Sequence, residues 1–437
     1  MPDRPAPRPV RRAAIVGGNR TPFVRAGRAY ARASAQDLMT AALDGLVARY
    51  GLAGERLGEV VGGAVLRHSR DLNITREALL STALDPATPA HDVSQACATS
   101  LQAAVTVANK IALGQVEAGI AAGADSASDA PIAVDEGLRR VLLELSRART
   151  PAAKLKALAG LRPGQLRPAP PRNAEPRTGL SMGEHAARTA LEHRVGREEQ
   201  DALALASHRH LAAAYERGFF DDLLTPYLGV RRDDVLRPDT TAEKLAQLRP
   251  VFGRRLEEAG QGEATMTAGN STPLSDGAAA VLLASDEWAA ERRLDVLAHL
   301  VDAETAAVDH ARGGEGLLTA PVHAVPRLLR RNGLRLEDFD VVEVHEAFAS
   351  TVLATLAAWE DAEFCRDRLG LDGPLGTVDR ARLNVTGSSL ATGHPFAATG
   401  ARILATTAKL LAERGGGLAL ISVCAAGGQG VAAVVER

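Results

Sequence analysis

The apolar positions of the chain fall into two patterns that alternate along its first third. Continuous apolar runs cover 13–18 and 59–66, and between them 35–50 carries apolar residues at helical spacing. Short apolar runs are typical of buried strands, and recurrence every three or four residues is typical of amphipathic helices. The alternation predicts an α/β fold of mostly parallel sheets covered by helices.

The last third of the chain repeats this order. A strand-like segment at 296–304 precedes a helical pattern at 321–333 and a further strand-like segment at 340–348. In the closing stretch His394 stands before a helical pattern, as Cys97 does in the first third. The repeat predicts two similar halves whose polar turns face one shared cleft.

A less regular region separates the two halves. It contains a basic amphipathic stretch at 138–166, a proline-rich stretch after it, and a strong helical pattern at 197–218. We interpret the region as an insertion that covers the active site. The expected parts are an N-terminal half made of 1–135 and 251–290, an insertion over 136–250, and a C-terminal half over 291–437.

The segment DVSQACATSLQAAV, residues 92–105, places a cysteine where a predicted strand is followed by a predicted helix. From Thr99 the apolar residues recur at helical spacing until Gly114, so Cys97 lies at or just before the first helical turn. The free N–H groups and the positive dipole of a helix N-terminus favour a thiolate. The alternative is a small buried apolar side chain, which is the usual role of a free cysteine.

Three further polar turns complete a candidate site. His345 and Glu346 follow an apolar run, His394 stands in GHP, and Cys424 begins CAAGGQG. A nucleophilic thiol, a histidine base and a second thiol are the parts of an acyl-transfer site. The small residues after Cys424 leave backbone N–H groups free to stabilise an oxyanion.

Composition narrows the classes of function. The 437 residues carry a net charge of −2, which gives no reason to expect nucleic acid as a partner. The three cysteines are too few and too scattered for a disulfide framework or a zinc cluster, so we expect a reducing compartment and no metal. No apolar run reaches membrane-spanning length, and the start MPDRPAPRPVRR lacks the apolar core of a secretory signal, so we expect a cytoplasmic protein.

Together these motifs resemble those of the thiolase family. The resemblance implies a thiolase-like α/β fold of duplicated βαβαβαββ halves, with two central mixed sheets in an α/β/α/β/α layering and an inserted loop domain. It also implies the activity of the family, which is cleavage of 3-ketoacyl-CoA by coenzyme A or the reverse Claisen condensation. The segments that carry the resemblance are RTPF (20–23), TAGNSTPLSDGAAAVLLAS (267–285), HEAFA (345–349), GHPFAATGAR (393–402) and CAAGGQGVAAVVE (424–436).

The resemblance assigns a role to each polar turn. Cys97 would take the acyl group as a thioester, and His394 would deprotonate Cys97 and help to hold the thioester oxygen of the substrate. Cys424 would protonate the departing acetyl-CoA carbanion. His345 stands in HEAF where many thiolases have Asn, and it would help to form the oxyanion hole for that carbanion, with Glu346 as a support.

The remaining site residues also follow from the resemblance. The backbone N–H groups of Cys97 and Ala426 would hold the oxyanion of the acyl-transfer step. Thr272 falls where other thiolases have a serine that binds the pantetheine arm, and Met182 falls in a segment that lines the substrate. Coenzyme A is a substrate in this family, so no cofactor is expected.

Within the family the chain resembles the thiolase subunit of the fatty-acid oxidation trifunctional complex, through AVLRHSRDLNITREALLSTAL (64–84), NSTPLSDG (270–277) and the histidine of HEAF. This branch implies 3-ketoacyl-CoA thiolase activity in β-oxidation, a homodimer, and a partner subunit with hydratase and dehydrogenase activities. It also implies that 138–166 contacts a membrane surface or that partner, and the alternative is a helical hairpin that covers the cleft. Two other functions stay open, a biosynthetic acetoacetyl-CoA thiolase and a non-catalytic scaffold of a multienzyme complex.

Overall fold

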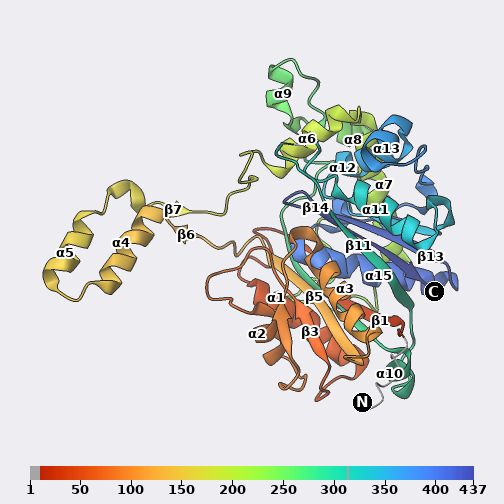
Figure 1. Ribbon diagram of the computed structural model, residues 1–437, viewed down its shortest axis with the longest axis horizontal. Helices are drawn as coiled ribbons and strands as arrows, with labels where there is room; N and C mark the ends of the chain where they lie inside the picture. Colours follow the sequence, from red (N-terminus) through yellow and green to blue (C-terminus); the bar gives the residue numbers. More distant parts are fainter. Residues whose placement is uncertain (1–9, 313) are drawn as a thin grey trace, which may run out of the picture.

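The computed structural model describes residues 10–312 and 314–437, so residues 1–9 of the basic, proline-rich start lie outside it. Ten strands of the described chain form one continuous sheet (Figure 1). In chain order they are β1 (Ala13–Arg20), β2 (Val24–Arg25), β3 (Glu59–Gly62), β4 (Ala90–Asp92), β5 (Ala118–Ser126), β10 (Ser275–Ala284), β11 (Ala298–Ala307), β12 (Val341–Val344), β13 (Leu418–Ala425) and β14 (Gln429–Glu436). Their spatial order is β12-β13-β14-β11-β1-β10-β5-β3-β4, with β2 beside β10.

The sheet has two parts, which meet where β1 pairs with β11. The two strands run antiparallel, with Ala13 opposite Leu300 and Ile15 opposite Ala298. The two expected sheets are therefore the two ends of one sheet, one end from each half of the chain.

The expectation of mostly parallel pairing is wrong for this sheet. Among the described strands of this sheet, the parallel neighbours are β3 with β4, β3 with β5, and β12 with β13. β10 returns from the insertion and lies antiparallel between β1 and β5, and β14 folds back on β13 through a tight turn. A tight turn joins only antiparallel neighbours, so the hairpin sets the direction of β14.

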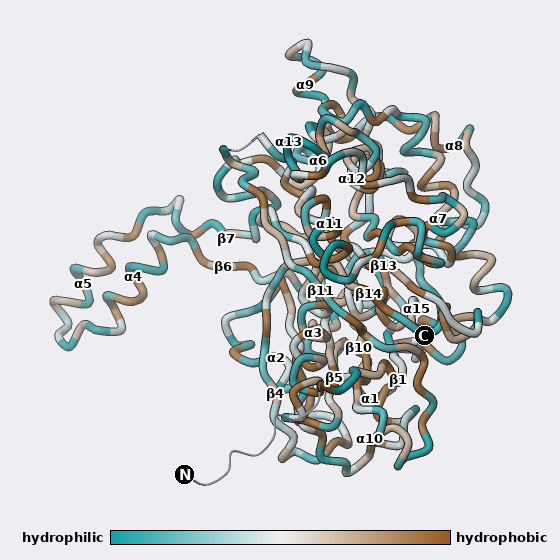
Figure 2. The backbone as a smooth tube through the Cα atoms, turned by 45° about the vertical axis from the view of Figure 1, so that its right-hand side comes forward, coloured by the Kyte–Doolittle hydropathy of each residue, from teal (hydrophilic) through white to brown (hydrophobic). Residues whose placement is uncertain are grey.

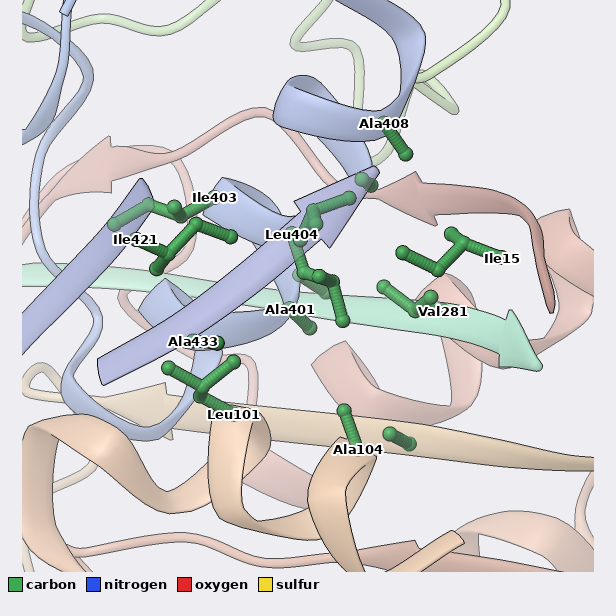
Figure 3. Close-up of a cluster of buried hydrophobic side chains, with 14 of the residues drawn as sticks. Ile15, Leu101, Ala104, Val281, Ala401, Ile403, Leu404, Ala408, Ile421 and Ala433 are labelled. Carbon is green, nitrogen blue, oxygen red and sulfur yellow. The ribbon is translucent and has the colours of Figure 1, made fainter. Parts of the chain in front are cut away.

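Helices cover both faces of each part of the sheet and give five layers. α1 (Ala35–Tyr50) and α2 (Ile74–Leu80) pack on the outer face of the N-terminal part. α11 (Ala320–Asn332) and α12 (Ala349–Glu360) pack on the outer face of the C-terminal part. α3 (Thr99–Ala112) and α15 (Thr399–Arg414) lie between the two parts (Figure 3). This arrangement confirms the α/β/α/β/α order that the resemblance implied.

The central strands are apolar on both faces because each face packs on helices. Along β10, Val281 and Leu283 belong to the core around α3 and α15, whereas Ala280 and Leu282 belong to the core around α1. The alternation follows from the two-residue period of a strand. It explains why these strands stand out in the sequence as continuous apolar runs.

The two central helices cross closely near their N-terminal ends. A Cβ at position 400 would lie 2.4 Å from the backbone N of Leu101, so only glycine fits at Gly400. This approach brings together the two turns that precede α3 and α15, one of which carries Cys97 and the other His394.

The first part of the insertion forms an arm, defined here as residues 133–169. It consists of α4 (Glu136–Arg147) and α5 (Pro151–Ala159), joined to the body through the paired strands β6 (Ala133–Val134) and β7 (Pro168–Ala169). The arm projects away from the body (Figures 1 and 2), so this part of the insertion does not lie over the polar turns.

The rest of the insertion packs on the C-terminal half. α6 (Met182–Glu192) and α7 (Arg197–Glu216) lie against α12, and α7 confirms the helix predicted at 197–218. The division of the chain at 135, 250 and 290 stays a prediction.

The remaining elements are η2 (Pro163–Leu166), α8 (Ala242–Ala246), β8 (Pro250–Phe252), α9 (Arg254–Glu258), β9 (Met266–Thr267), α10 (Asp286–Glu291), η3 (Leu336–Asp338), α13 (Ala362–Leu369), η4 (Arg380–Arg382) and α14 (Ser389–Thr392). Among the helices of the described ranges, none has the length and apolar character needed to cross a membrane.

Candidate active site

Cys97 lies in a strained turn between β4 and α3. Ala96 has a φ of 44°, a left-handed conformation that is unfavourable for alanine by about 1–3 kcal/mol. Thr99 holds the turn, because its Oγ1 accepts from the N–H of Gln95 at 2.9 Å and donates to the carbonyl of Ala96 at 2.7 Å. The short helix η1 (Ala96–Ala98) leads directly into α3, so Cys97 stands at the N-terminal turn that the sequence predicted.

His394 lies in the corresponding turn of the C-terminal half. Gly393, with a φ of 97°, ends α14, and the chain enters α15 through η5 (Phe396–Ala398). The Nε2 of His394 lies 3.1 Å from the Sγ of Cys97. Its Nδ1 lies 2.6 Å from the Oγ1 of Thr399. One ring nitrogen is therefore held by α15, and the other faces the thiol.

Burial determines the protonation of this pair. It raises the pKa of the Cys97 thiol to about 12, although backbone hydrogen bonds from Ala426 and from Cys97 itself act in the opposite direction. Burial, followed by the charge of Arg402, lowers the pKa of His394 to about 3. Desolvation thus opposes the stabilisation of a thiolate that the helix N-terminus favours. Both shifts favour an uncharged thiol beside an uncharged imidazole.

Cys424 and Ala426 come from the hairpin of β13 and β14. Gly427 and Gly428 have φ values of 83° and 71°, which glycine adopts without strain. The turn directs the N–H of Ala426 at the sulfur of Cys97, beside the N–H of Cys97 itself. Cys424 is buried, and burial together with the proximity of Cys97 raises the pKa of its thiol.

His345 follows β12 and lies beside His394, with 4.2 Å between the ring centroids. Its Nδ1 lies 2.9 Å from the Oγ of Ser389, and its Nε2 has no hydrogen-bond partner in the described part of the chain. Burial, with the neighbouring His394 and Arg402, holds the pKa of His345 well below its usual value. Cys97, His345 and His394 each place a donor atom within 4.8 Å of the others. The fold thus gathers the predicted thiol and both predicted imidazoles at one point.

Comparison with known proteins assigns the family. The N-terminal domain of thiolases matches residues 13–287, and the C-terminal domain of thiolases matches residues 294–437. The chain belongs to the thiolase family. It is 44% identical over 431 residues to the 3-ketoacyl-CoA thiolase of Pectobacterium carotovorum, covering 97% of this chain and 96% of that protein. It is 42% identical to a protein of the same name from Yersinia enterocolitica, covering 97% of each.

Solved thiolase structures share the fold. Human mitochondrial 3-ketoacyl-CoA thiolase in complex with CoA is similar with a TM-score of 0.79 and 29% identity, covering 98% of each chain. The acetyl-CoA acetyltransferase of Bacillus anthracis is similar with a TM-score of 0.78 and 29% identity, covering 98% of this chain and 99% of that one. Both confirm the thiolase fold that the sequence motifs predicted.

The two residues that the resemblance assigned to substrate and CoA binding lie in the same region as the polar turns of this thiolase. Met182, at the start of α6, packs on an apolar cluster that contains Cys424 and Phe348. The Oγ1 of Thr272 donates to the carbonyl of Ala347, in the HEAF segment, at 2.9 Å. Both side chains lie beside the polar turns, and their contact with substrate stays a prediction.

Glu346 holds the HEAF segment in place. Its carboxylate accepts from Asn384 Nδ2 at 2.7 Å, from Ser207 Oγ at 2.7 Å, and from the N–H of Leu390 at 3.1 Å. These contacts occupy both carboxylate oxygens, which fits a supporting role and leaves His345 as the group that faces the site.

Sequence reasoning missed several side chains that hold the turns. Asp125, at the end of β5, accepts from the N–H of Leu66 at 2.7 Å and of Ala397 at 2.8 Å, and so joins the N-terminal half to the turn of His394. The sequence offered no signal for these contacts, because Asp125 lies far from the GHP motif in the chain. The other missed residues around that motif are Ser388, Ser389, Thr399 and Arg402.

Proposed function

We propose that this thiolase is a 3-ketoacyl-CoA thiolase (acetyl-CoA C-acyltransferase) of fatty-acid β-oxidation. It would cleave 3-ketoacyl-CoA with CoA into acetyl-CoA and a shortened acyl-CoA. The observation that carries the proposal is the 3.1 Å approach of His394 Nε2 to Cys97 Sγ. The two relatives of that name, which match nearly the whole chain, support it. We propose that the reaction uses no cofactor, because coenzyme A enters it as a substrate.

In the first half-reaction, Cys97 attacks the C3 ketone of the substrate while His394 takes the thiol proton. The C2–C3 bond breaks, the acyl group stays on Sγ as a thioester, and the electron pair passes to the acetyl-CoA enolate. The Nε2–H groups of His345 and of protonated His394 donate to the enolate oxygen. Cys424 then gives its proton to C2, and acetyl-CoA leaves.

In the second half-reaction, the thiolate of Cys424 takes the proton of the CoA thiol, and the CoA sulfur attacks the thioester on Cys97. The backbone N–H groups of Cys97 and Ala426, which already point at the Cys97 sulfur, stabilise the tetrahedral oxyanion. The shortened acyl-CoA leaves, and His394 returns its proton to Cys97. Two separate half-reactions of this kind give ping-pong kinetics.

Steady-state kinetics separates the proposal from its two alternatives. We expect parallel double-reciprocal lines for thiolysis of 3-ketohexadecanoyl-CoA with CoA, and faster turnover of this substrate than of acetoacetyl-CoA. Preference for acetoacetyl-CoA, together with rapid condensation of acetyl-CoA, would instead support a biosynthetic acetoacetyl-CoA thiolase. No turnover of either substrate would support a scaffold.

We also propose that the arm, residues 133–169, contacts a membrane surface. Exposed leucines lie on both helices: Leu142 is 48% exposed on α4, and Leu155 is 70% exposed on α5. Figure 2 shows hydrophobic and hydrophilic colours alternating along these helices. The basic residues beside the leucines suit the anionic headgroups of an interfacial site. They are Arg139, Arg140, Arg147, Arg149, Lys154 and Lys156.

Deletion of 138–166 tests the arm, because paired β6 and β7 hold the two cut ends together. We expect the deletion to abolish flotation with anionic liposomes while thiolysis stays within about twofold. Leu155→Ser with Leu158→Ser should have most of the same effect. Unchanged flotation would rule the membrane role out, and binding of a hydratase/dehydrogenase subunit that depends on the arm would assign the arm to that partner.

We further propose a homodimer built on β4. This strand is the last in the sheet and precedes the turn that carries Cys97. An open sheet edge readily pairs with a second copy. Light scattering coupled to gel filtration should give twice the mass of the chain for wild type. Ala90→Pro should lower the measured mass, because the backbone N–H of Ala90 points away from β3 to the open edge. A monomeric wild type would contradict this arrangement.

A further inference from the structure

The hydrogen bonds of Ser389 are determined by its two neighbours. The Nη2 of Arg402 lies 3.0 Å from the Oγ of Ser389, and a guanidinium donates hydrogen bonds without accepting any. The Oγ of Ser389 therefore accepts from Arg402, and its single hydrogen stays available. The Nδ1 of His345 lies 2.9 Å from the same oxygen and is the acceptor that the structure offers to that hydrogen.

This order of donors favours the tautomer of neutral His345 in which the Ser389 hydroxyl donates to Nδ1. In that tautomer Nδ1 carries no hydrogen, and the proton is on Nε2. The Nε2 is buried without a hydrogen-bond partner among the described residues. A buried N–H of this kind lacks an acceptor at rest and gains one when a substrate oxygen enters the site.

The neighbouring His394 must carry its proton on the other ring nitrogen, Nδ1. Its Nε2 lies 3.1 Å from Cys97 Sγ and must be free of hydrogen to take the thiol proton. Its Nδ1 then carries the hydrogen and donates to Thr399 Oγ1, which lies 2.6 Å away. Two imidazoles whose centroids are 4.2 Å apart thus carry their protons on different nitrogens, and a different hydroxyl sets each one.

Arg402 acts on His345 in a second way. It is buried, and its positive charge opposes protonation of the ring beside it. Burial lowers the pKa of Arg402 only to about 10, so its guanidinium keeps its charge at neutral pH. The ring is thereby held neutral, with one acceptor nitrogen and one donor nitrogen.

We propose that Ser389 and Arg402 are positioning residues for His345. Arg402 orients the Ser389 hydroxyl, and the hydroxyl fixes the tautomer in which Nε2–H of His345 faces the substrate oxygen. This inference rests on the proposed function, in which His345 stabilises the acetyl-CoA enolate.

Two adjacent serines offer a matched pair of variants. Ser388 and Ser389 are both fully buried and both accept from Arg402, at 3.1 Å and 3.0 Å. His345 contacts the hydroxyl of Ser389. We expect Ser389→Ala to lower kcat about tenfold with KM changed by less than about twofold, and Ser388→Ala to keep kcat within about twofold of wild type. Equal losses in the two variants, at equal melting temperatures, would overturn the proposal.

The tautomer can be read directly by NMR of protein labelled with ¹⁵N-histidine. We expect a non-protonated Nδ1 and a protonated Nε2 for His345 in wild type, with the resonances assigned through His345→Asn. Ser389→Ala should give a mixture of tautomers, and Ser388→Ala should leave the wild-type signals unchanged. A protonated Nδ1 in wild type would overturn the proposal.

Variants of His345 separate this inference from the proposed function. An amide has no tautomer, so Ser389→Ala in the His345→Asn background should change kcat by less than about twofold. If His345→Ala itself leaves kcat unchanged, the role of His345 in the oxyanion hole fails. If His345→Ala lowers kcat and Ser389→Ala does not, the proposed function stands and the positioning role of Ser389 is rejected.

Discussion

His394 Nε2 lies 3.1 Å from Cys97 Sγ, although 297 positions separate the two residues in the chain. The contact exists because α3 and α15 cross closely at Gly400 and because each helix begins with a turn that carries one of the two groups. Burial raises the pKa of Cys97 and lowers that of His394, and both shifts favour the uncharged pair over a preformed ion pair.

Alkylation should reveal the neutral thiol. The pKa of Cys97, raised to about 12 by burial, means that the thiolate fraction grows with pH throughout the neutral range. We expect the rate of labelling of Cys97 by iodoacetamide in Cys424→Ser to rise about tenfold per pH unit from pH 6 to pH 9. Peptide mass spectrometry measures the rate at this site. A rate that is already constant below pH 7 would indicate an ion pair and contradict the neutral state.

Thr399 should matter for turnover because it holds His394. Its Oγ1 lies 2.6 Å from Nδ1 of His394. Thr399→Val removes that partner, and we expect kcat for thiolysis to fall about tenfold, the value of one buried hydrogen bond. Thr407→Val on the same helix is the control, since its hydroxyl has no partner in the described structure and should be dispensable. Equal kcat in the two variants would contradict the role of Thr399.

Glu343 should make stability depend on pH. Burial raises the pKa of its carboxyl from 4.5 to about 8. The native state therefore keeps this proton up to about pH 8, while the unfolded chain loses it near pH 4.5. The contribution of Glu343 to stability is complete below that lower value and is lost as the pH rises through the higher one.

Glu343→Gln removes the titrating carboxyl, and with it the loss of stability at high pH. Calorimetry should show the variant gaining about 3 kcal/mol relative to wild type between pH 5.5 and pH 8.5. Glu346→Gln, whose carboxylate accepts three hydrogen bonds, is the control and should be less stable than wild type. Destabilisation of Glu343→Gln at pH 8.5 would mean that an ionised Glu343 pairs with Arg402.

Zinc should inhibit this thiolase. The donor atoms of Cys97, His345 and His394 lie within 4.8 Å of one another, and thiolate with imidazole is a ligand set that Zn²⁺ accepts. We expect low micromolar Zn²⁺ to stop thiolysis, EDTA to restore it, and His345→Asn to weaken the inhibition at least about tenfold. Co²⁺ should give a thiolate charge-transfer band that is absent in Cys97→Ser. Equal sensitivity of wild type and His345→Asn would show that zinc acts elsewhere.

The catalytic motifs and the pattern of strands and helices could be predicted from sequence, because both depend on short stretches of the chain. Cys97, His345, His394 and Cys424 each stand in a short motif, so their roles follow from the thiolase resemblance without any knowledge of distance. The alternation of strand and helix predicted sheets covered by helices, because buried strands are apolar on both faces, and the thiolase resemblance implied the five-layer order. Strand direction was predicted wrongly, since the pattern within β10 does not show that the strand returns antiparallel after a long insertion.

The contacts that set protonation could not be predicted from sequence. The pKa of Cys97 depends on how deeply the turn is buried, and burial is a property of the packed layers rather than of the motif. Ser389 and Arg402 stand on either side of the GHP motif, but only the folded α14 and α15 bring both to His345. Hydrogen bonds that join separate elements leave no periodic signal in the chain.

The most direct test of the account is intact-protein mass spectrometry of the acyl-enzyme. Wild type and Cys97→Ala are mixed with 3-ketohexadecanoyl-CoA in the absence of CoA, quenched, and weighed. We predict that wild type gains the mass of the shortened acyl group, that hydroxylamine removes it, and that Cys97→Ala gains nothing. An unlabelled wild type, or a label that persists in Cys97→Ala, would contradict the role of Cys97 as the nucleophile.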